Sequence, residues 1–316
     1  MSWQHDICEE LGGKLAVKKM EMTMLSLLKE MIEAGCDINE RQWRGCPLWA
    51  TLLDDSEVPA SIIRYLLKEG ASLHVDDGDE PLLFRALSND MNSEIIKLLI
   101  EYGADASYVS EEQETALQIA CRRHEYNVDT LSLLIEHGCP INVQKVDCGN
   151  SALGNAALAD LPSETLSYLI KQGADIHAAD SKGNTPLMRL CSNAICSSDS
   201  VALFIEAGAD LAHKNHDGNT ALGILCSGSG DENMLEVLVE HGMDVNAVEN
   251  GLTYPMMAVL NRNWAALDKL LSLGFSNYAV VYPESQKTLV EVINEEIEDC
   301  WDDAVAARIK QVIAQL

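Results

Sequence analysis

Aromatic and basic residues are both scarce in this chain of 316 residues. Five Trp, eight Tyr and three Phe make up 5% of the sequence, so the core must be mostly aliphatic and Ala, which suits closely packed helices. There are 22 Lys and Arg against 50 Asp and Glu, which gives a net charge of −28. This charge argues against binding nucleic acid, whose phosphates a protein must neutralise, and against docking on anionic lipid.

Long apolar runs and paired cysteines are missing as well. No stretch approaches the roughly 18 residues that a membrane-spanning helix needs. The first six residues, MSWQHD, resemble no secretory signal. We therefore expect a cytoplasmic protein with reduced thiols, and translocation into a host cell is the alternative. The ten Cys include no C-x-x-C pair, which disfavours a zinc site.

One short pattern recurs along nearly the whole chain: an apolar pair, a polar stretch, Gly, a small residue, Asp and an aliphatic residue. Residues 31–38 (MIEAGCDI) and 169–176 (LIKQGADI) are examples. The glycines of the eight copies are Gly35, Gly70, Gly103, Gly138, Gly173, Gly208, Gly242 and Gly274. Each follows an amphipathic run with helical spacing, where Gly can adopt the left-handed conformation that ends a helix.

A second pattern alternates with the first. Thr115-Ala116, Thr185-Pro186 and Thr220-Ala221 each combine a helix N-cap with a residue suited to the first helical position. Weaker copies occur at Pro47, Pro81, Ser151 and Pro255. Turn residues such as those of 182–184 (KGN) come just before the motif. Each unit therefore predicts a tight turn, a short helix, a short loop, a longer helix and a Gly stop.

These motifs resemble the ankyrin repeat, which has a period of about 33 residues and T-P-L-H-x-A at its first helix. The resemblance implies an all-α solenoid of about nine helix-turn-helix units with short β-hairpin-like turns. We expect an N-terminal capping repeat at 1–39, seven internal repeats at 40–278 and C-terminal capping helices at 279–316, at about 286–297 and 302–315. Two departures stand out: no His follows the Pro-Leu step, and Gln113 replaces the Gly of its turn.

The residues that suggest chemistry mostly occupy repeat positions. Cys121, Cys191 and Cys226 share one column of the first helix, in which the alignment also places Leu260; Cys36 and Cys139 follow stop glycines. A buried Cys behaves there as a small hydrophobe. The 227–231 stretch (SGSGD) lacks the Lys of a phosphate-binding loop, and Asp231 is expected to cap a helix. We predict a non-enzymatic chain without cofactor or metal, and an enzyme with a site hidden in divergent repeats is the alternative.

The resemblance also indicates where a partner would bind, because ankyrin repeats usually contact partners through the hairpin tips and the exposed ends of the first helices. The candidate contact residues are Trp43, Arg44, Trp49, Asp76, Asp77, Asp79, Glu80, Phe84, Glu111, Glu112, Glu114, Arg122, Arg123, Asp147, Lys182, His216, Asp217 and Glu249. Trp43, Trp49 and Phe84 are either apolar anchors or packing residues.

Two adjacent tips, 76–80 and 111–114, hold seven acids and no base. Repeats stack at about 8–10 Å, close to the ~8 Å Debye length, so their fields add. The tips then either attract a basic partner or only keep the chain in solution. We expect Arg122 and Arg123 to pair with Glu111 or Glu112, or with an acid on the partner.

The predicted function is protein–protein interaction, with a basic protein partner, without nucleic acid or membrane, and with a monomeric chain when unbound. An intracellular inhibitor or immunity-type protein, with carboxylates in place of nucleic-acid phosphates, is the favoured hypothesis. An adaptor or bacterial effector scaffold that captures a host protein is the alternative. Fold alone does not decide between them.

Overall fold

The computed structural model describes residues 21–40, 47–74, 80–193, 197–228, 232–300 and 302–314. The chain forms two compact units. Unit 1 comprises Met1–Tyr108 and Thr115–Cys139, and unit 2 comprises Val109–Glu114 and Pro140–Leu316.

Unit 1 is built from helix pairs. Residues 21–33 are helical. The elements that follow are the 3-10 helix η1 (Leu48–Asp54), α2 (Ala60–Lys68), α3 (Leu82–Ser88), α4 (Ser93–Glu101), α5 (Ala116–Ala120) and α6 (Val128–Glu136). The first helices η1, α3 and α5 pack in one row, and the second helices α2, α4 and α6 pack in another. The two rows bury their facing apolar stripes against each other.

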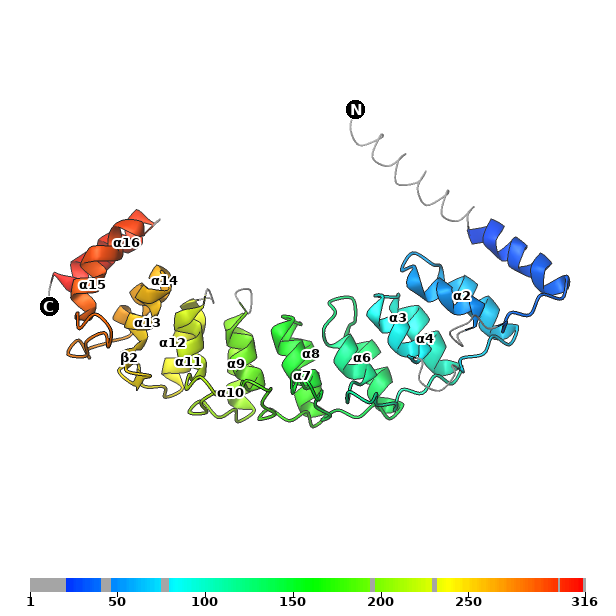
Figure 1. Ribbon diagram of the computed structural model, residues 1–316, viewed down its shortest axis with the longest axis horizontal. Coiled ribbons are helices and arrows are strands. Elements are labelled where there is room, and N and C mark those ends of the chain that lie inside the picture. The colour runs from blue at the N-terminus through cyan, green and yellow to red at the C-terminus, as the bar shows by residue number, and fades with distance from the viewer. Residues whose placement is uncertain are drawn as a thin grey trace, which may run out of the picture. The chain divides into compact units, whose positions relative to one another are not determined.

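Unit 2 repeats the same arrangement (Figure 1). Its elements are α7 (Ala152–Leu158), α8 (Ser163–Lys171), α9 (Pro186–Cys191), α10 (Ser198–Glu206), α11 (Ala221–Ser227), α12 (Glu232–Glu240), β1 (Val248–Glu249), β2 (Leu252–Thr253), α13 (Tyr254–Leu260), α14 (Trp264–Ser272), α15 (Leu289–Glu296), the 3-10 helix η2 (Ile297–Asp299) and α16 (Asp303–Ile313). The odd-numbered helices α7 to α15 form the row of first helices, and α8 to α16 form the second row. Strands β1 and β2 pair antiparallel at one hairpin tip.

The predicted helix ends are confirmed. All eight stop glycines have positive φ, from 86° at Gly35 to 101° at Gly242. The Thr115, Ser151, Thr185 and Thr220 hydroxyls each accept the N–H of the third helical residue. In α5 a capping box is complete, because the Gln118 side chain accepts the Thr115 N–H at 2.8 Å. The two C-terminal helices also lie where the periodicity predicts them.

Asn side chains at one repeat position join three of the repeats to the next repeat. Asn142 Nδ2 donates to the Gly173 carbonyl at 2.9 Å, and Asn142 Oδ1 accepts the Asp175 N–H at 2.9 Å. Asn39 bonds Gly70 and Ser72 in the same way in unit 1. These bonds satisfy a helix-terminal carbonyl that has no partner within its own helix.

The cysteine columns are mostly buried as expected. Cys121, Cys139, Cys191 and Cys226 are buried. Two assignments are wrong. Cys36 is exposed, and Leu260 is 56% exposed. Because α13 begins at Tyr254, Val259 rather than Leu260 occupies the buried Cys column. The expected cap Asp231 lies outside the described residues.

Within the described part of the chain, no helix is both long enough and apolar enough to span a bilayer.

Candidate protein-interaction surface

In two hairpin tips of unit 2, a side chain at the first position closes the turn. Asp180 Oδ1 accepts the N–H groups of Lys182 and Asn184 at 2.9 and 2.8 Å. Its other oxygen receives Arg189 Nη1 at 3.0 Å. In the next tip, Asn215 Oδ1 accepts the N–H groups of residues 217 and 219 in the same way. The turn is therefore held from inside, and its apex side chains remain exposed.

Backbone hydrogen bonds set successive tips of unit 2 side by side. Val146 N donates to Glu112 O, Ser181 N to Cys148 O, and His216 N to Lys182 O, each at 2.9 Å. This ladder places four successive tips of unit 2 next to one another, and these tips carry the residues Glu111, Asp147, Lys182 and Asp217. All four are exposed.

Most of the charge carried by these four residues is negative. Glu111, Asp147 and Asp217 form no ion pair with any described residue, and Lys182 is the exposed cation among the apex positions. We call Glu111, Asp147, Lys182 and Asp217 the tip row. The row holds three carboxylates and one ammonium group, so its charge is negative overall and it favours a positively charged partner.

One cation at the 111–114 tip was not expected from the sequence. Lys145 lies between the acids of the 111–114 tip, with its Nζ 3.2 Å from Glu112 and 3.3 Å from Glu114. Burial lowers the pKa of Lys145, but hydrogen bonds and attraction from Glu112 and Glu114 outweigh this, so the net pKa lies above its ordinary value. The expected run of acids without a base is therefore wrong at this tip, and Glu111 is the acid of this tip that has no ion pair with a described residue. Lys145 is one repeat away in sequence, which hides the pairing.

Three predicted contact residues are buried and leave the candidate surface. Trp49 is 5% exposed and Phe84 is 2% exposed, so the packing interpretation holds for both. Phe84 also stacks edge to face with Tyr108 at 5.4 Å between ring centroids. Glu249, expected at a tip, is 2% exposed.

Glu249 acts inside unit 2 instead. Its carboxylate accepts the Thr220 N–H at 3.1 Å and the Tyr254 hydroxyl at 2.9 Å. The third residue of α11 is Gly223, which has no side chain to complete a capping box. Glu249, from the next hairpin, takes the place that Gln118 takes in α5, and a Cβ on Gly223 would collide with it.

Arg123, which follows α5, does not pair as predicted. Arg123 Nη1 pairs with Asp90 at 3.0 Å, and its Nη2 donates to the Ser88 carbonyl at 2.7 Å. Arg123 therefore joins neighbouring repeats of unit 1 and does not pair with Glu111 or Glu112. Arg122 is exposed, and so is Glu80. The predicted contacts Trp43, Arg44, Asp76, Asp77 and Asp79 lie outside the described residues.

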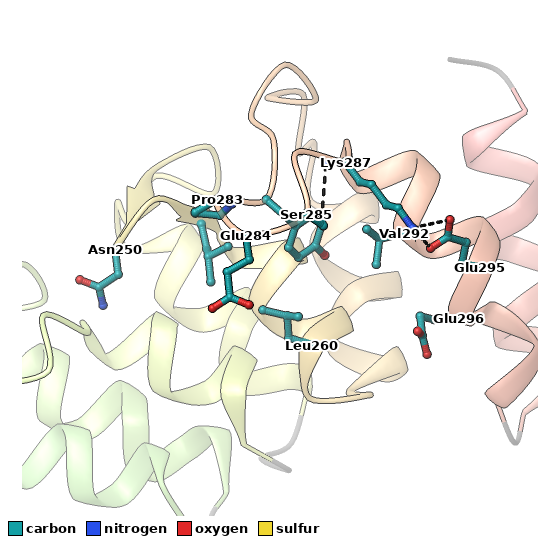
Figure 2. Close-up of a pocket in the computed structure, with 11 residues that line it drawn as sticks. Asn250, Leu260, Pro283, Glu284, Ser285, Lys287, Val292, Glu295 and Glu296 are labelled. Carbon is teal, nitrogen blue, oxygen red and sulfur yellow. Dashed lines mark hydrogen bonds and ion pairs between the residues drawn. The ribbon is translucent and has the colours of Figure 1, made fainter.

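A hollow of about 490 Å³ lies at the C-terminal end of the row of first helices in unit 2. Figure 2 shows it between the 283–287 turn, the end of α13 and helix α15. Leu252, Leu260 and Val292 supply apolar surface, and Glu284, Glu295 and Glu296 supply carboxylates. We call this the C-terminal hollow. In the sequence, Leu260 is the residue that could have indicated this hollow, because Ser192 and Ser227 stand at the corresponding place in the preceding two repeats.

Three of the buried thiols, those of Cys121, Cys139 and Cys226, are poor candidates for catalysis. Burial raises the pKa of Cys121 and of Cys226, and burial also raises the pKa of Cys139 despite hydrogen bonds from the Leu117, Thr115 and Ala116 groups. A thiol must ionise to act as a nucleophile. Among the described residues, no three His, Cys, Asp or Glu side chains are placed to hold a metal ion.

The comparisons with known proteins agree with this architecture. A family model of ankyrin repeats, in three copies, matches residues 59–145, 83–180, 125–215 and 187–279. A comparison with curated proteins found no match. The matched residues contain the helices α2 to α14 and seven of the eight stop glycines, and the all-α fold class is confirmed. The chain belongs to the ankyrin-repeat family, whose repeats form protein–protein interaction modules.

Proposed function

We propose that this chain binds a positively charged protein through the tip row of unit 2. The observation that carries the proposal is that three of four adjacent tips of unit 2 present an exposed carboxylate, from Glu111, Asp147 and Asp217, without an ion pair among the described residues. The net charge of −28 adds a long-range attraction for basic proteins.

The geometry suits recognition of a folded surface or an extended segment. The tips are braced by internal hydrogen bonds and by the backbone ladder, so little ordering is needed when a partner docks. Carboxylates on braced tips also match the way in which charge complementarity speeds association. These features support an inhibitor that covers a basic surface, acting as a monomer in a 1:1 complex.

The test is capture of partners from the native lysate at two salt concentrations, read by mass spectrometry. The test variant carries Glu111→Gln, Asp147→Asn and Asp217→Asn. The control variant carries Glu164→Gln, Glu206→Gln and Glu240→Gln, which removes the same charge from the exposed surface of the second helices.

We expect a basic protein to be captured at low salt by the wild type and the control. The tip variant should bind it at least about fivefold more weakly, since each exposed ion pair contributes about 0.2–1 kcal/mol. A partner retained by the tip variant and in high salt would overturn the proposal and favour an adaptor with an apolar interface.

A further inference from the structure

The C-terminal hollow combines two chemistries, whereas the residues of the tip row are all charged. It has exposed apolar side chains next to carboxylates, all within unit 2. We infer that this hollow anchors a segment of the partner in which an apolar side chain lies next to a Lys or Arg. The inference rests on the proposed function and names the partner feature that the C-terminal end of the surface selects.

The apolar component is not required by the repeat. Leu260 ends α13 and is 56% exposed, whereas Ser227 ends α11 at the equivalent position. Leu252 and Val292 line the same hollow. Leu260 thus provides contact surface for an apolar group of a partner, as concave apolar sites do.

The charged component selects a cation. Two of the three carboxylates are engaged within the chain: Glu295 Oε1 accepts from Lys287 Nζ at 2.7 Å, and Glu296 lies 3.7 Å from Arg262 Nη2. Glu284 is exposed and has no ion pair with a described residue. Figure 2 shows the Glu284 side chain directed toward the space beside Leu260. A Lys or Arg of the partner can reach Glu284 while its aliphatic stem covers Leu260.

The size of the hollow fits this occupant. A volume of about 490 Å³ is within the range that encloses a small ligand or a few side chains. The three carboxylates outnumber the single ammonium group of Lys287 among the lining residues, so an acidic segment is disfavoured. The hollow therefore favours a basic segment with an apolar anchor over an apolar one without charge.

The test uses the full chain, with labelled Leu and Val methyl groups, and three synthetic peptides observed by NMR titration. The first peptide is acetyl-GKLKLG-amide. In the second, Glu replaces both Lys, and in the third, Ser replaces both Leu. We expect the first peptide to shift the methyl signals of Leu252, Leu260 and Val292, and to bind at least about fivefold more tightly than either counterpart.

Two variants test the anchors, and each has a matched control. Leu260→Ser and Glu284→Gln should each weaken binding of the first peptide by at least about threefold. Leu158→Ser changes a Leu that ends α7 and is 44% exposed, and Glu206→Gln removes an exposed carboxylate at the end of the second helix α10, which belongs neither to the hollow nor to the tip row. Neither control should alter the peptide affinity. All four side chains are exposed, so we expect every variant to fold.

The inference is overturned if no peptide shifts the three methyl signals, if the Glu or Ser peptide binds as tightly, or if the controls weaken binding equally. These outcomes differ from failure of the proposed function. If the tip variant loses a captured basic protein while Leu260→Ser and Glu284→Gln retain it fully, the proposed function stands and the hollow is not an anchor. If no basic protein depends on the tip row, the proposed function itself fails.

Discussion

Glu249 is a buried carboxylate that joins two repeats of unit 2. Thr220 N and the Tyr254 hydroxyl both donate to it, so its removal leaves two buried donors without this acceptor. Burial raises the pKa of the Tyr254 hydroxyl, as does the neighbouring Glu249 charge, so Tyr254 stays protonated and donates across the neutral range. At the scale of single residues, Glu249 therefore couples one repeat to the next.

The contact between Glu249 and Gly223 predicts that the effect of Gly223→Ala on stability changes sign when Glu249 is replaced. Gly223→Ala should destabilise the protein, because the new Cβ collides with the Glu249 carboxylate. In a Glu249→Ala background the collision is gone, and Gly223→Ala should stabilise the helix by about 0.5–1 kcal/mol. Glu249→Ala alone should cost about 1–3 kcal/mol. Urea unfolding of the four proteins in a double-mutant cycle measures this coupling; additive effects would contradict the account.

Gln113 stands in a turn position that suits glycine. Its φ is 59°, and the equivalent Gly183 and Gly218 have φ of 78° and 79°. A non-Gly residue in this conformation is strained, whereas Gly loses more entropy on folding. Gln113→Gly should therefore raise the urea midpoint slightly, with a net gain of roughly 0.5 kcal/mol. Glu111→Gly, in the same turn but without positive φ, should lower it. An equal loss in both variants would show that residue 113 is not strained.

At the scale of the elements, the caps of the first helices differ in a way that sequence alone does not show. The Thr115 hydroxyl accepts the Gln118 N–H at 3.2 Å, and the Gln118 side chain accepts the Thr115 N–H. Thr253 holds the equivalent N-cap position of α13, but its buried hydroxyl has no hydrogen-bond partner among the described residues. A buried hydroxyl without a partner is unfavourable.

Replacement of each Thr by Val should separate these two roles. Thr115→Val removes a cap and should lower the unfolding free energy by about 1 kcal/mol. Thr253→Val keeps the shape and removes an unpaired hydroxyl, so stability should stay unchanged or rise. Thermal or urea unfolding of the two variants provides the comparison. A loss at Thr253 as large as that at Thr115 would mean that its hydroxyl does make a stabilising bond.

The elements themselves were largely predictable because each repeat carries its own local signals. The stop glycines, the Thr caps and the period placed the helix pairs, and these signals act within a few residues of the chain. The errors concern contacts across a whole repeat. Glu249 was expected at a hairpin tip because its position in the repeat corresponds to a tip position. No residue near it in the sequence indicates that Gly223 leaves space for its carboxylate.

The candidate surface was less predictable for the same reason. Lys145 pairs with Glu112 and Glu114, and Arg123 pairs with Asp90, across 31 to 33 positions of sequence. Burial of Trp49 and Phe84 also depends on the neighbouring repeat. The C-terminal hollow forms only where the 283–287 turn, α13 and α15 come together. The sequence feature that indicates it is Leu260, an apolar residue at a position where the preceding two repeats have Ser.

At the scale of the whole molecule, the excess of acid should govern association kinetics. Attraction between a chain of net charge −28 and a basic partner is screened by salt over about 8 Å at physiological ionic strength. We therefore expect the association rate with the captured partner to fall steeply between 50 and 300 mM NaCl, and the dissociation rate to change less. Stopped-flow mixing resolves the two rates. A salt effect confined to dissociation would contradict electrostatic steering.

Hydrogen–deuterium exchange of the chain, alone and with its captured basic partner, tests most directly whether the tip row is the binding surface. The account predicts slower exchange in the complex at 145–149, 180–183 and 215–218, with little change in the second helices α8, α10 and α12. Protection confined to those second helices, with unchanged exchange at the tips, would contradict it.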